Sequence, residues 1–138
     1  MTGIYNHTID AKNRIFIPAR MRDELGDVFY VTLSMEKCLT GYTPEAWDSM
    51  REKTRALPTA TRKKMRPIFA YAHKCEPDSQ GRILLPQHLL DFAELEKNVT
   101  IVGFDECIEF WNSDLWVDIA TEETTPEYIS GVFMELEV

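Results

Sequence analysis

The chain has 138 residues and carries 15 Lys and Arg against 23 Asp and Glu, a formal net charge of −8. A hydrophobic content of 44% and an aromatic content of 11% exclude a disordered chain and indicate a soluble globular protein. The length suits one domain, or two very small units that share a core. The net charge, taken alone, argues against binding to nucleic acid.

The charge is divided unevenly along the chain. Residues 1–75 hold 13 Lys and Arg against 8 Asp and Glu, a net charge of +5, whereas residues 76–138 hold 2 against 15, a net charge of −13. This asymmetry favours contact with nucleic acid, self-association, or both. The simpler alternative is that both charged surfaces are only solvated.

The start of the chain predicts two short strands and a helix. Residues 4–9 and 14–17 have strand-like composition, and an Asx-type turn at 10–13 separates them. Pro18 is expected at the first position of a helix over 19–25, which a glycine ends.

A hairpin and a longer helix are expected next. Residues 28–33 and 38–42 predict the two strands of the hairpin. Thr43 is a good N-cap residue and Pro44 follows it, so a helix should begin here with Trp47 on its apolar face.

An internal repeat organises the chain. Residues 10–18, DAKNRIFIP, align with residues 78–86, DSQGRILLP, at an offset of 68. A second block, 38–47, aligns with 107–116 at an offset of 69 and matches a cysteine and a tryptophan. Two blocks in one order indicate a tandem duplication.

The second copy predicts the same elements as the first. Each copy alone is too short to close a core, so two copies related by a pseudo-twofold axis favour one intertwined barrel over two separate domains. The expected elements are strands at 82–85, 99–103 and 107–111, with helices beginning at Pro86 and after Asn112.

Two segments lie outside the repeat. Residues 57–72 contain the basic run 62–66 and predict a helical linker, bent or broken at Pro67. The acidic segment 122–138 predicts an amphipathic helix with Thr125 as its N-cap, whose apolar stripe should pack against the body or a neighbour. The expected organisation is a first unit at 1–56, the linker at 57–72, a second unit at 73–121 and a C-terminal helix at 122–138.

The repeated Asp-x-x-x-Arg motif, followed by an apolar strand and proline, resembles the signature of the MraZ family, which carries two tandem SpoVT-AbrB-like units. Residues 5–18 resemble its first signature and residues 75–86 its second. The resemblance implies an α+β, β-rich fold in which both units form one swapped-hairpin, pseudo-dimeric β-barrel with flanking helices.

The same resemblance implies a bacterial transcriptional regulator, cytoplasmic and nucleoid-associated. The family binds repeated DNA boxes upstream of the cell-division and cell-wall gene cluster that includes its own gene, and it assembles into ring-shaped homo-oligomers. The expected partners are double-stranded DNA and further copies of the chain, with no cofactor, membrane or small-molecule substrate. The charge split suggests head-to-tail contacts between the copies of a ring.

Arg14 is the leading candidate for contact with DNA, and Arg82 is its equivalent in the second unit. A guanidinium offers five donors in a planar fork, which suits phosphate or the O6/N7 edge of guanine. Asp10 and Asp78 are expected to hold the turns, and an Asp–Arg pair that only stabilises the barrel is the alternative. The predicted DNA-binding residues are Lys12, Asn13, Arg14, Arg20, Gln80 and Arg82, with Arg22 as a weaker candidate.

The turns depart from the family signature and from each other. Asn13 stands where the family more often has glycine, and asparagine tolerates a left-handed backbone. Gln80 takes the place of Lys12 and His88 that of Arg20, so the second motif has fewer cations.

An enzyme is not expected. His73 and Cys75 could form a nucleophile–base pair or a metal site, but the chain has no CxxC or HxxxH spacing. Three widely spaced cysteines favour packing thiols in a reducing cytosol, and the charged first 20 residues predict no signal peptide. The other open alternative is an AbrB-like interaction module of the antitoxin type, with 122–138 as its partner surface.

Overall fold

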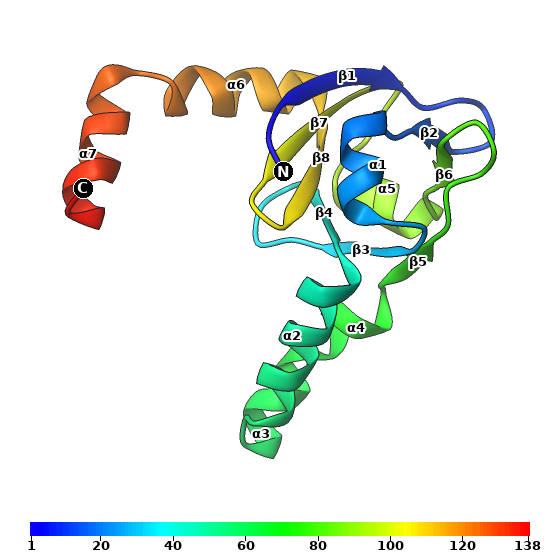
Figure 1. Cartoon of the computed structure of the whole chain (residues 1–138), viewed down its shortest axis with the longest axis horizontal. Helices are drawn as coiled ribbons and strands as arrows, with labels where there is room; N and C mark the ends of the chain where they lie inside the picture. The colour runs from blue at the N-terminus through cyan, green and yellow to red at the C-terminus, as the bar shows by residue number, and fades with distance from the viewer.

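Eight strands form two antiparallel sheets in the computed structural model, which describes residues 1–138 (Figure 1). One sheet has six strands in the order β1-β7-β8-β4-β3-β5, and β2 pairs with β6 in a separate ribbon. The strands are β1 (Ile4–Thr8), β2 (Arg14–Phe16), β3 (Phe29–Leu33), β4 (Leu39–Tyr42), β5 (His73–Cys75), β6 (Arg82–Leu84), β7 (Asn98–Phe104) and β8 (Cys107–Asn112). The predicted β-rich α+β class is confirmed, but the larger sheet is open between its edge strands β1 and β5, so a closed barrel is not found.

The helices fall into two groups. Figure 1 shows α1 and α5 beside the strands, whereas α2 to α4 and α6 to α7 project from the body as two arms. The helices are α1 (Ala19–Leu25), α2 (Pro44–Arg55), α3 (Thr59–Arg62), the 3₁₀ helix η1 (Lys63–Met65), α4 (Arg66–Ala70), α5 (Gln87–Phe92), α6 (Ser113–Glu123) and α7 (Pro126–Leu136). None of them combines the length and the apolar character that crossing a bilayer requires.

Side-chain caps start the three longest helices. Thr43 Oγ1 accepts a hydrogen bond from the Ala46 amide at 3.1 Å, and Asn112 and Thr125 cap α6 and α7 in the same way. Such caps satisfy amides that lack a partner in the first helical turn. The predicted starts of α2, α6 and α7 are therefore confirmed.

Proline positions differ from the prediction at three places. Pro18 and Pro86 precede α1 and α5 as their N-caps, with extended ψ angles of 139° and 150°, and are not the first helical residues. The linker is divided into α3, η1 and α4, and Pro67 lies in the first turn of α4. A proline there loses no hydrogen bond, because first-turn amides have no intrahelical partner.

The two repeats exchange their first strands. β1 of the first repeat pairs with β7 of the second, with Tyr5 opposite Ile101. β5 of the second repeat pairs with β3 of the first, with Tyr30 opposite Lys74. The strands β4 and β8 pair with each other between the two hairpins. Neither repeat therefore completes the sheet by itself.

Both repeats contribute to one hydrophobic core. Ile15 and Ile83 face each other across the ribbon and are each 1% exposed. They join the fully buried Phe29 and Phe110 of the large sheet in a cluster of 18 buried residues. Burial of one such large side chain stabilises the fold by about 1.5–3 kcal/mol.

Matching aromatic pairs dock the two arms. Tyr42 lies 5.9 Å from Trp47 of α2, and Trp111 lies 5.8 Å from Trp116 of α6, each at an interplanar angle of 50°. The equivalent positions predicted from the repeat thus have the same geometry. Trp47 and Trp111 are buried, and Trp116 is partly buried against Trp111, so all three are packing residues.

Candidate nucleic-acid interface

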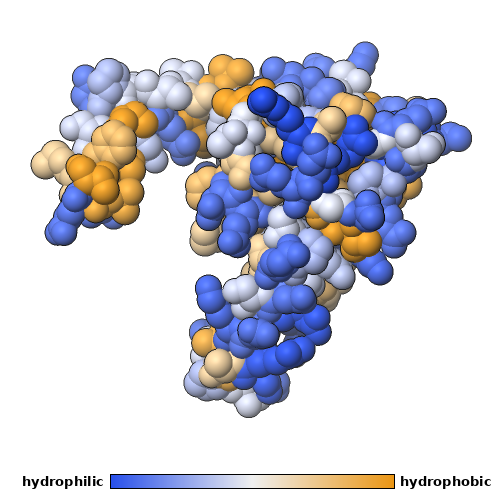
Figure 2. All heavy atoms as spheres, in the orientation of Figure 1, coloured by the Kyte–Doolittle hydropathy of each residue, from blue (hydrophilic) through white to orange (hydrophobic).

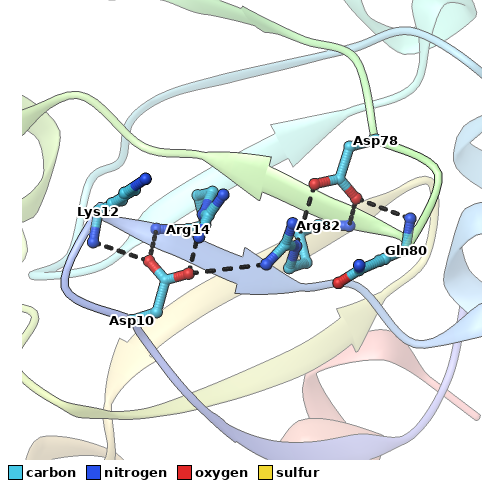
Figure 3. A network of polar contacts seen from close by, with 6 residues as sticks. All are labelled: Asp10, Lys12, Arg14, Asp78, Gln80 and Arg82. Carbon is cyan, nitrogen blue, oxygen red and sulfur yellow. Dashed lines mark hydrogen bonds and ion pairs between the residues drawn. The ribbon is translucent and has the colours of Figure 1, made fainter.

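The β2–β6 ribbon turns one face to the core and the other outward. Ile15 and Ile83 are the buried pair, and successive side chains of a strand point to opposite faces. The outward positions are Arg14, Phe16, Arg82 and Leu84, with Arg14 opposite Leu84 and Phe16 opposite Arg82. The two predicted arginines therefore share one surface (Figure 3).

The first turn is built around the carboxylate of Asp10. Its Oδ1 accepts hydrogen bonds from the amides of Lys12 and Arg14, both at 2.9 Å. Its Oδ2 accepts a hydrogen bond from Arg14 Nε at 2.8 Å. Asn13 turns the backbone with a φ of +60°, a conformation that asparagine tolerates.

The second turn repeats this arrangement with different side chains. Asp78 Oδ1 accepts hydrogen bonds from the amides of Gln80 and Arg82 at 2.9 Å, and its Oδ2 accepts one from Arg82 Nε at 3.0 Å. Gly81 takes the place of Asn13, with a φ of +78°. Both Asp–Arg pairs are thus internal to their turns, as the structural alternative requires.

Backbone hydrogen bonds join each turn to the strand end of the other repeat. The Leu85 amide donates to the Asn13 carbonyl and the Ile17 amide donates to the Gly81 carbonyl, both at 2.9 Å. The two turns consequently hold a fixed position relative to each other.

A helix of the opposite repeat supports each turn, by different chemistry. Asn13 Nδ2 donates to Oε1 of Gln87 on α5 at 3.3 Å. At the second turn the guanidinium of Arg22, from α1, occupies the space beside Gly81, where an added Cβ would lie 2.7 Å from Arg22 Cζ. An asparagine at the second turn would therefore have to displace the Arg22 guanidinium, whereas the asparagine of the first turn forms a hydrogen bond.

Turn hydrogen bonds keep both carboxylates ionised. The amide of Arg14 is the main cause that lowers the pKa of Asp10, and its guanidinium adds to the effect. The amide of Arg82 lowers the pKa of Asp78 in the same way. A lowered pKa stabilises the fold above the ordinary carboxyl pKa, and this contribution is lost as the pH falls through the folded value. Both carboxylates are therefore ionised at neutral pH, where they can accept the hydrogen bonds of the turns.

Five of the six predicted site residues meet at the ribbon. Lys12, Asn13, Arg14, Gln80 and Arg82 lie on the two turns or the strands that follow them. Arg20 lies on α1 with an exposed side chain, and no hydrogen bond or ion pair joins it to the other five. The sequence analysis did not identify Gln87 as a support and gave Arg22 only as a weaker candidate. The repeat offers no signal for either residue, since Ala19 is equivalent to Gln87 and Leu90 to Arg22.

The ribbon can present its arginines in a fixed orientation. Each Asp accepts a hydrogen bond from the Nε edge of its guanidinium, and no protein hydrogen bond engages the Nη groups, although Nη1 of Arg82 also lies within ion-pair distance of Asp10. The side chains of Arg14 and Arg82 remain 31% and 28% exposed. A planar donor fork held in this way suits a phosphate or the acceptor edge of guanine.

Other candidate sites have different chemistry. A cavity of about 730 Å³ between the arms is mainly apolar, and Glu36, Glu109 and Glu123 lie among its lining residues. No group of three His, Cys, Asp or Glu side chains is placed to hold a metal ion. Burial raises the pKa of the Cys75 thiol to about 12. The hydrogen bond of this thiol is to the backbone carbonyl oxygen of His73, at 3.7 Å, and not to the imidazole ring.

Comparisons with known proteins cover nearly the whole chain. A family model described as "MraZ protein, putative antitoxin-like" matches residues 1–66 and 68–127. A protein named "Transcriptional regulator MraZ" from Carboxydothermus hydrogenoformans is 47% identical over 117 residues, which cover 83% of this chain and 82% of the relative. Proteins of the same name from Heliobacterium modesticaldum and Caldicellulosiruptor saccharolyticus are 42% and 39% identical, covering 91% and 99% of this chain and 90% and 98% of the relatives.

Proposed function

Because the chain belongs to the MraZ family, we propose that it is a transcriptional regulator, not an enzyme, that binds double-stranded DNA through the outer face of the β2–β6 ribbon. The observation that supports this proposal most directly is that Arg14 and Arg82 lie on the same outward face of the ribbon, each oriented by its own aspartate. A two-stranded ribbon fits the major groove of B-DNA and can carry side chains to base edges.

The contacts divide into two kinds. Arg14 and Arg82, which have fixed guanidinium planes, are suited to read base edges. Lys12, Asn13 and Gln80 lie on the two turns, and Arg20 lies on α1; these four are suited to phosphate and sugar, which position the protein without reading sequence. The targets we propose are repeats upstream of the division and cell-wall gene cluster that includes the chain's own gene, so the protein would reside on the nucleoid.

A duplex from the region upstream of the gene tests the proposal directly. Wild-type protein should bind it in a gel shift at moderate salt in preference to a scrambled duplex. Arg14→Ala should lose most of this preference, roughly 5- to 150-fold in affinity, because a bidentate arginine–guanine contact contributes about 1–3 kcal/mol. Arg51→Ala is the matched control, since Arg51 lies on α2 beside Asp48. Equal binding by Arg14→Ala would refute the site.

Assembly of several copies would place several ribbons side by side, and multivalent contact raises affinity without new contacts in each copy. Two features support a homo-oligomeric ring. Helix α7 exposes Ile129, Phe133 and Met134, and Figure 2 shows this apolar surface at the end of its arm. The basic segment Arg62–Arg66 and the acidic second half of the chain, residues 76–138, are also complementary in charge.

Native mass spectrometry at two salt concentrations tests the electrostatic part of this assembly. Smaller species at high salt would support charged head-to-tail contacts, because salt screens exposed charges. Rings that persist at high salt would show that apolar contacts such as α7 hold them together.

The exchange of β1 and β5 also supports the finer description of the fold as two units, 1–56 and 73–121, in a swapped-hairpin, pseudo-dimeric barrel. On this interpretation, residues 57–72 form the linker between the units, and residues 122–138 form a C-terminal helix outside both units.

An antitoxin-type interaction module is the second candidate function, and the exposed apolar face of α7 favours it. It would gain support if wild-type protein bound no upstream DNA but retained a protein partner through α7, which Phe133→Ser should abolish.

A further inference from the structure

We propose that Arg22 supplies a phosphate contact beside the second turn, so that a residue of the first repeat completes the cationic surface of the second. This inference rests on the proposed binding of DNA by the ribbon, and it adds a residue that the repeated motif does not contain. The proposal is based on the contacts of Arg22, on α1, with Phe16 of the ribbon and with Gly81 of the second turn.

The position of Arg22 follows from three contacts. Its Nε donates to the Ile17 carbonyl at 2.9 Å, and its Cζ lies 5.3 Å from the centroid of the Phe16 ring. The same guanidinium fills the space over Gly81, which lies directly before Arg82. Phe16 is an outward residue of the ribbon and pairs with Arg82, so the guanidinium on its ring belongs to the surface that carries Arg14 and Arg82.

These contacts leave part of the guanidinium for a ligand. Nε is engaged by a protein carbonyl, whereas no protein acceptor is bonded to either Nη group. The ring of Phe16 holds the guanidinium plane by a cation–π contact, which reduces the conformational freedom that binding would otherwise have to restrict. An arginine held at one edge, with Nη donors at the other, suits a phosphate oxygen.

The arrangement compensates for a difference between the two turns. The first turn has two cations of its own, Lys12 and Arg14, whereas the second has Arg82 with Gln80 at the position of Lys12. The residue equivalent to Arg22 in the second repeat is Leu90, which is buried and contributes no charge to the first turn. With Arg22 included, each turn has two cations beside it.

The salt dependence of DNA binding tests this role. Each phosphate contact contributes about 0.9 to the slope of log affinity against log salt concentration. Arg22→Gln should lower that slope by about one contact, and should weaken specific and scrambled duplexes by a similar factor. Arg22→Lys should retain the slope, because it keeps the charge, even though it loses the contact through Nε. Arg51→Gln is the control and should bind like wild type.

Thermal unfolding of each variant separates binding from stability. A folded Arg22→Gln with the wild-type slope and affinity would overturn the proposal, as would a loss confined to the specific duplex. If Arg22→Lys lost as much DNA affinity as Arg22→Gln, Arg22 would support the turn and would not bind phosphate. That result would also overturn the proposal. If wild-type protein binds no duplex, the proposed function itself fails, whatever residue 22 is.

Discussion

Nη1 of Arg82 lies 4.0 Å from Oδ2 of Asp10, so the arginine of the second turn reaches the aspartate of the first. The same Asp10 oxygen accepts the hydrogen bond from Arg14 Nε. Asp78, in contrast, pairs only with Arg82. The two turns are therefore coupled through one carboxylate, and the coupling is not symmetric.

This asymmetry predicts unequal effects of removing the two carboxylate charges. Asp10→Asn should weaken binding of the upstream duplex more than Asp78→Asn, because Asp10 orients Arg14 and attracts Arg82. The asparagine amide oxygen can still accept from the turn amides, so both variants should remain folded. Affinities measured at one salt concentration, with circular dichroism as the control for folding, decide the order. An equal or reversed order would contradict the coupling.

Truncation of side chains on the two faces of β6 should have very different effects on stability. Ile83 is 1% exposed and faces the core, whereas its neighbour Leu84 is 50% exposed on the outer face. Ile83→Ala should lower the free energy of unfolding by about 2–5 kcal/mol, the usual cost of such a cavity. Leu84→Ala should change it by about 0.5 kcal/mol or less. Chemical denaturation measures both, and a similar cost at the two positions would contradict the orientation of the strand.

The repeat allowed much of this arrangement to be predicted from sequence. Equivalent Asp, Arg, Ile and Pro residues identified both turns and the strands that follow them. The exchange of β1 and β5 could not be read from their composition, because a short strand of three to five residues does not specify its partner. Arg22 and Gln87 were missed as supports for a related reason, since each contacts the opposite repeat and has no equivalent in its own motif.

The helix caps predict how firmly each arm is coupled to the body. Thr43 is 9% exposed and caps α2, which packs on the sheet through Trp47, whereas Thr125 caps the projecting helix α7. Thr43→Ala should reduce the free energy of global unfolding by about 1 kcal/mol. Thr125→Ala should instead increase hydrogen exchange within α7 and leave global unfolding nearly unchanged in the monomer. A large global cost of Thr125→Ala would show that α7 is packed more firmly than its exposure indicates.

Two histidines should make the fold less stable as the pH falls below neutrality. Burial lowers the pKa of His7, and burial together with the nearby His88 lowers that of His73. The unfolded chain then binds more protons than the folded one between the ordinary pKa of about 6.5 and the lower folded value. The free energy of unfolding should therefore fall as the pH drops through 6.5. Denaturation from pH 8 to 5 measures this slope, which His7→Gln combined with His73→Gln should flatten.

The different supports of the two turns predict a specific interaction between residues 22 and 81. Gly81→Asn copies the first turn and tolerates the positive φ, but its Cβ would lie within 3 Å of the Arg22 guanidinium and would displace it from Phe16. Gly81→Asn should therefore lower the free energy of unfolding more in the wild-type background than in the Arg22→Ala background, where the space beside residue 81 is free. Residues in such contact couple by about 0.5–3 kcal/mol in a double-mutant cycle. Asn13→Gly is the control, because it removes the 3.3 Å hydrogen bond to Gln87 and keeps the positive φ, and its effect should not depend on residue 22. If the losses of unfolding free energy caused by Gly81→Asn and Arg22→Ala were additive, the Arg22 guanidinium would not contact the second turn. The difference between Asn13 and Gly81 would then need another cause.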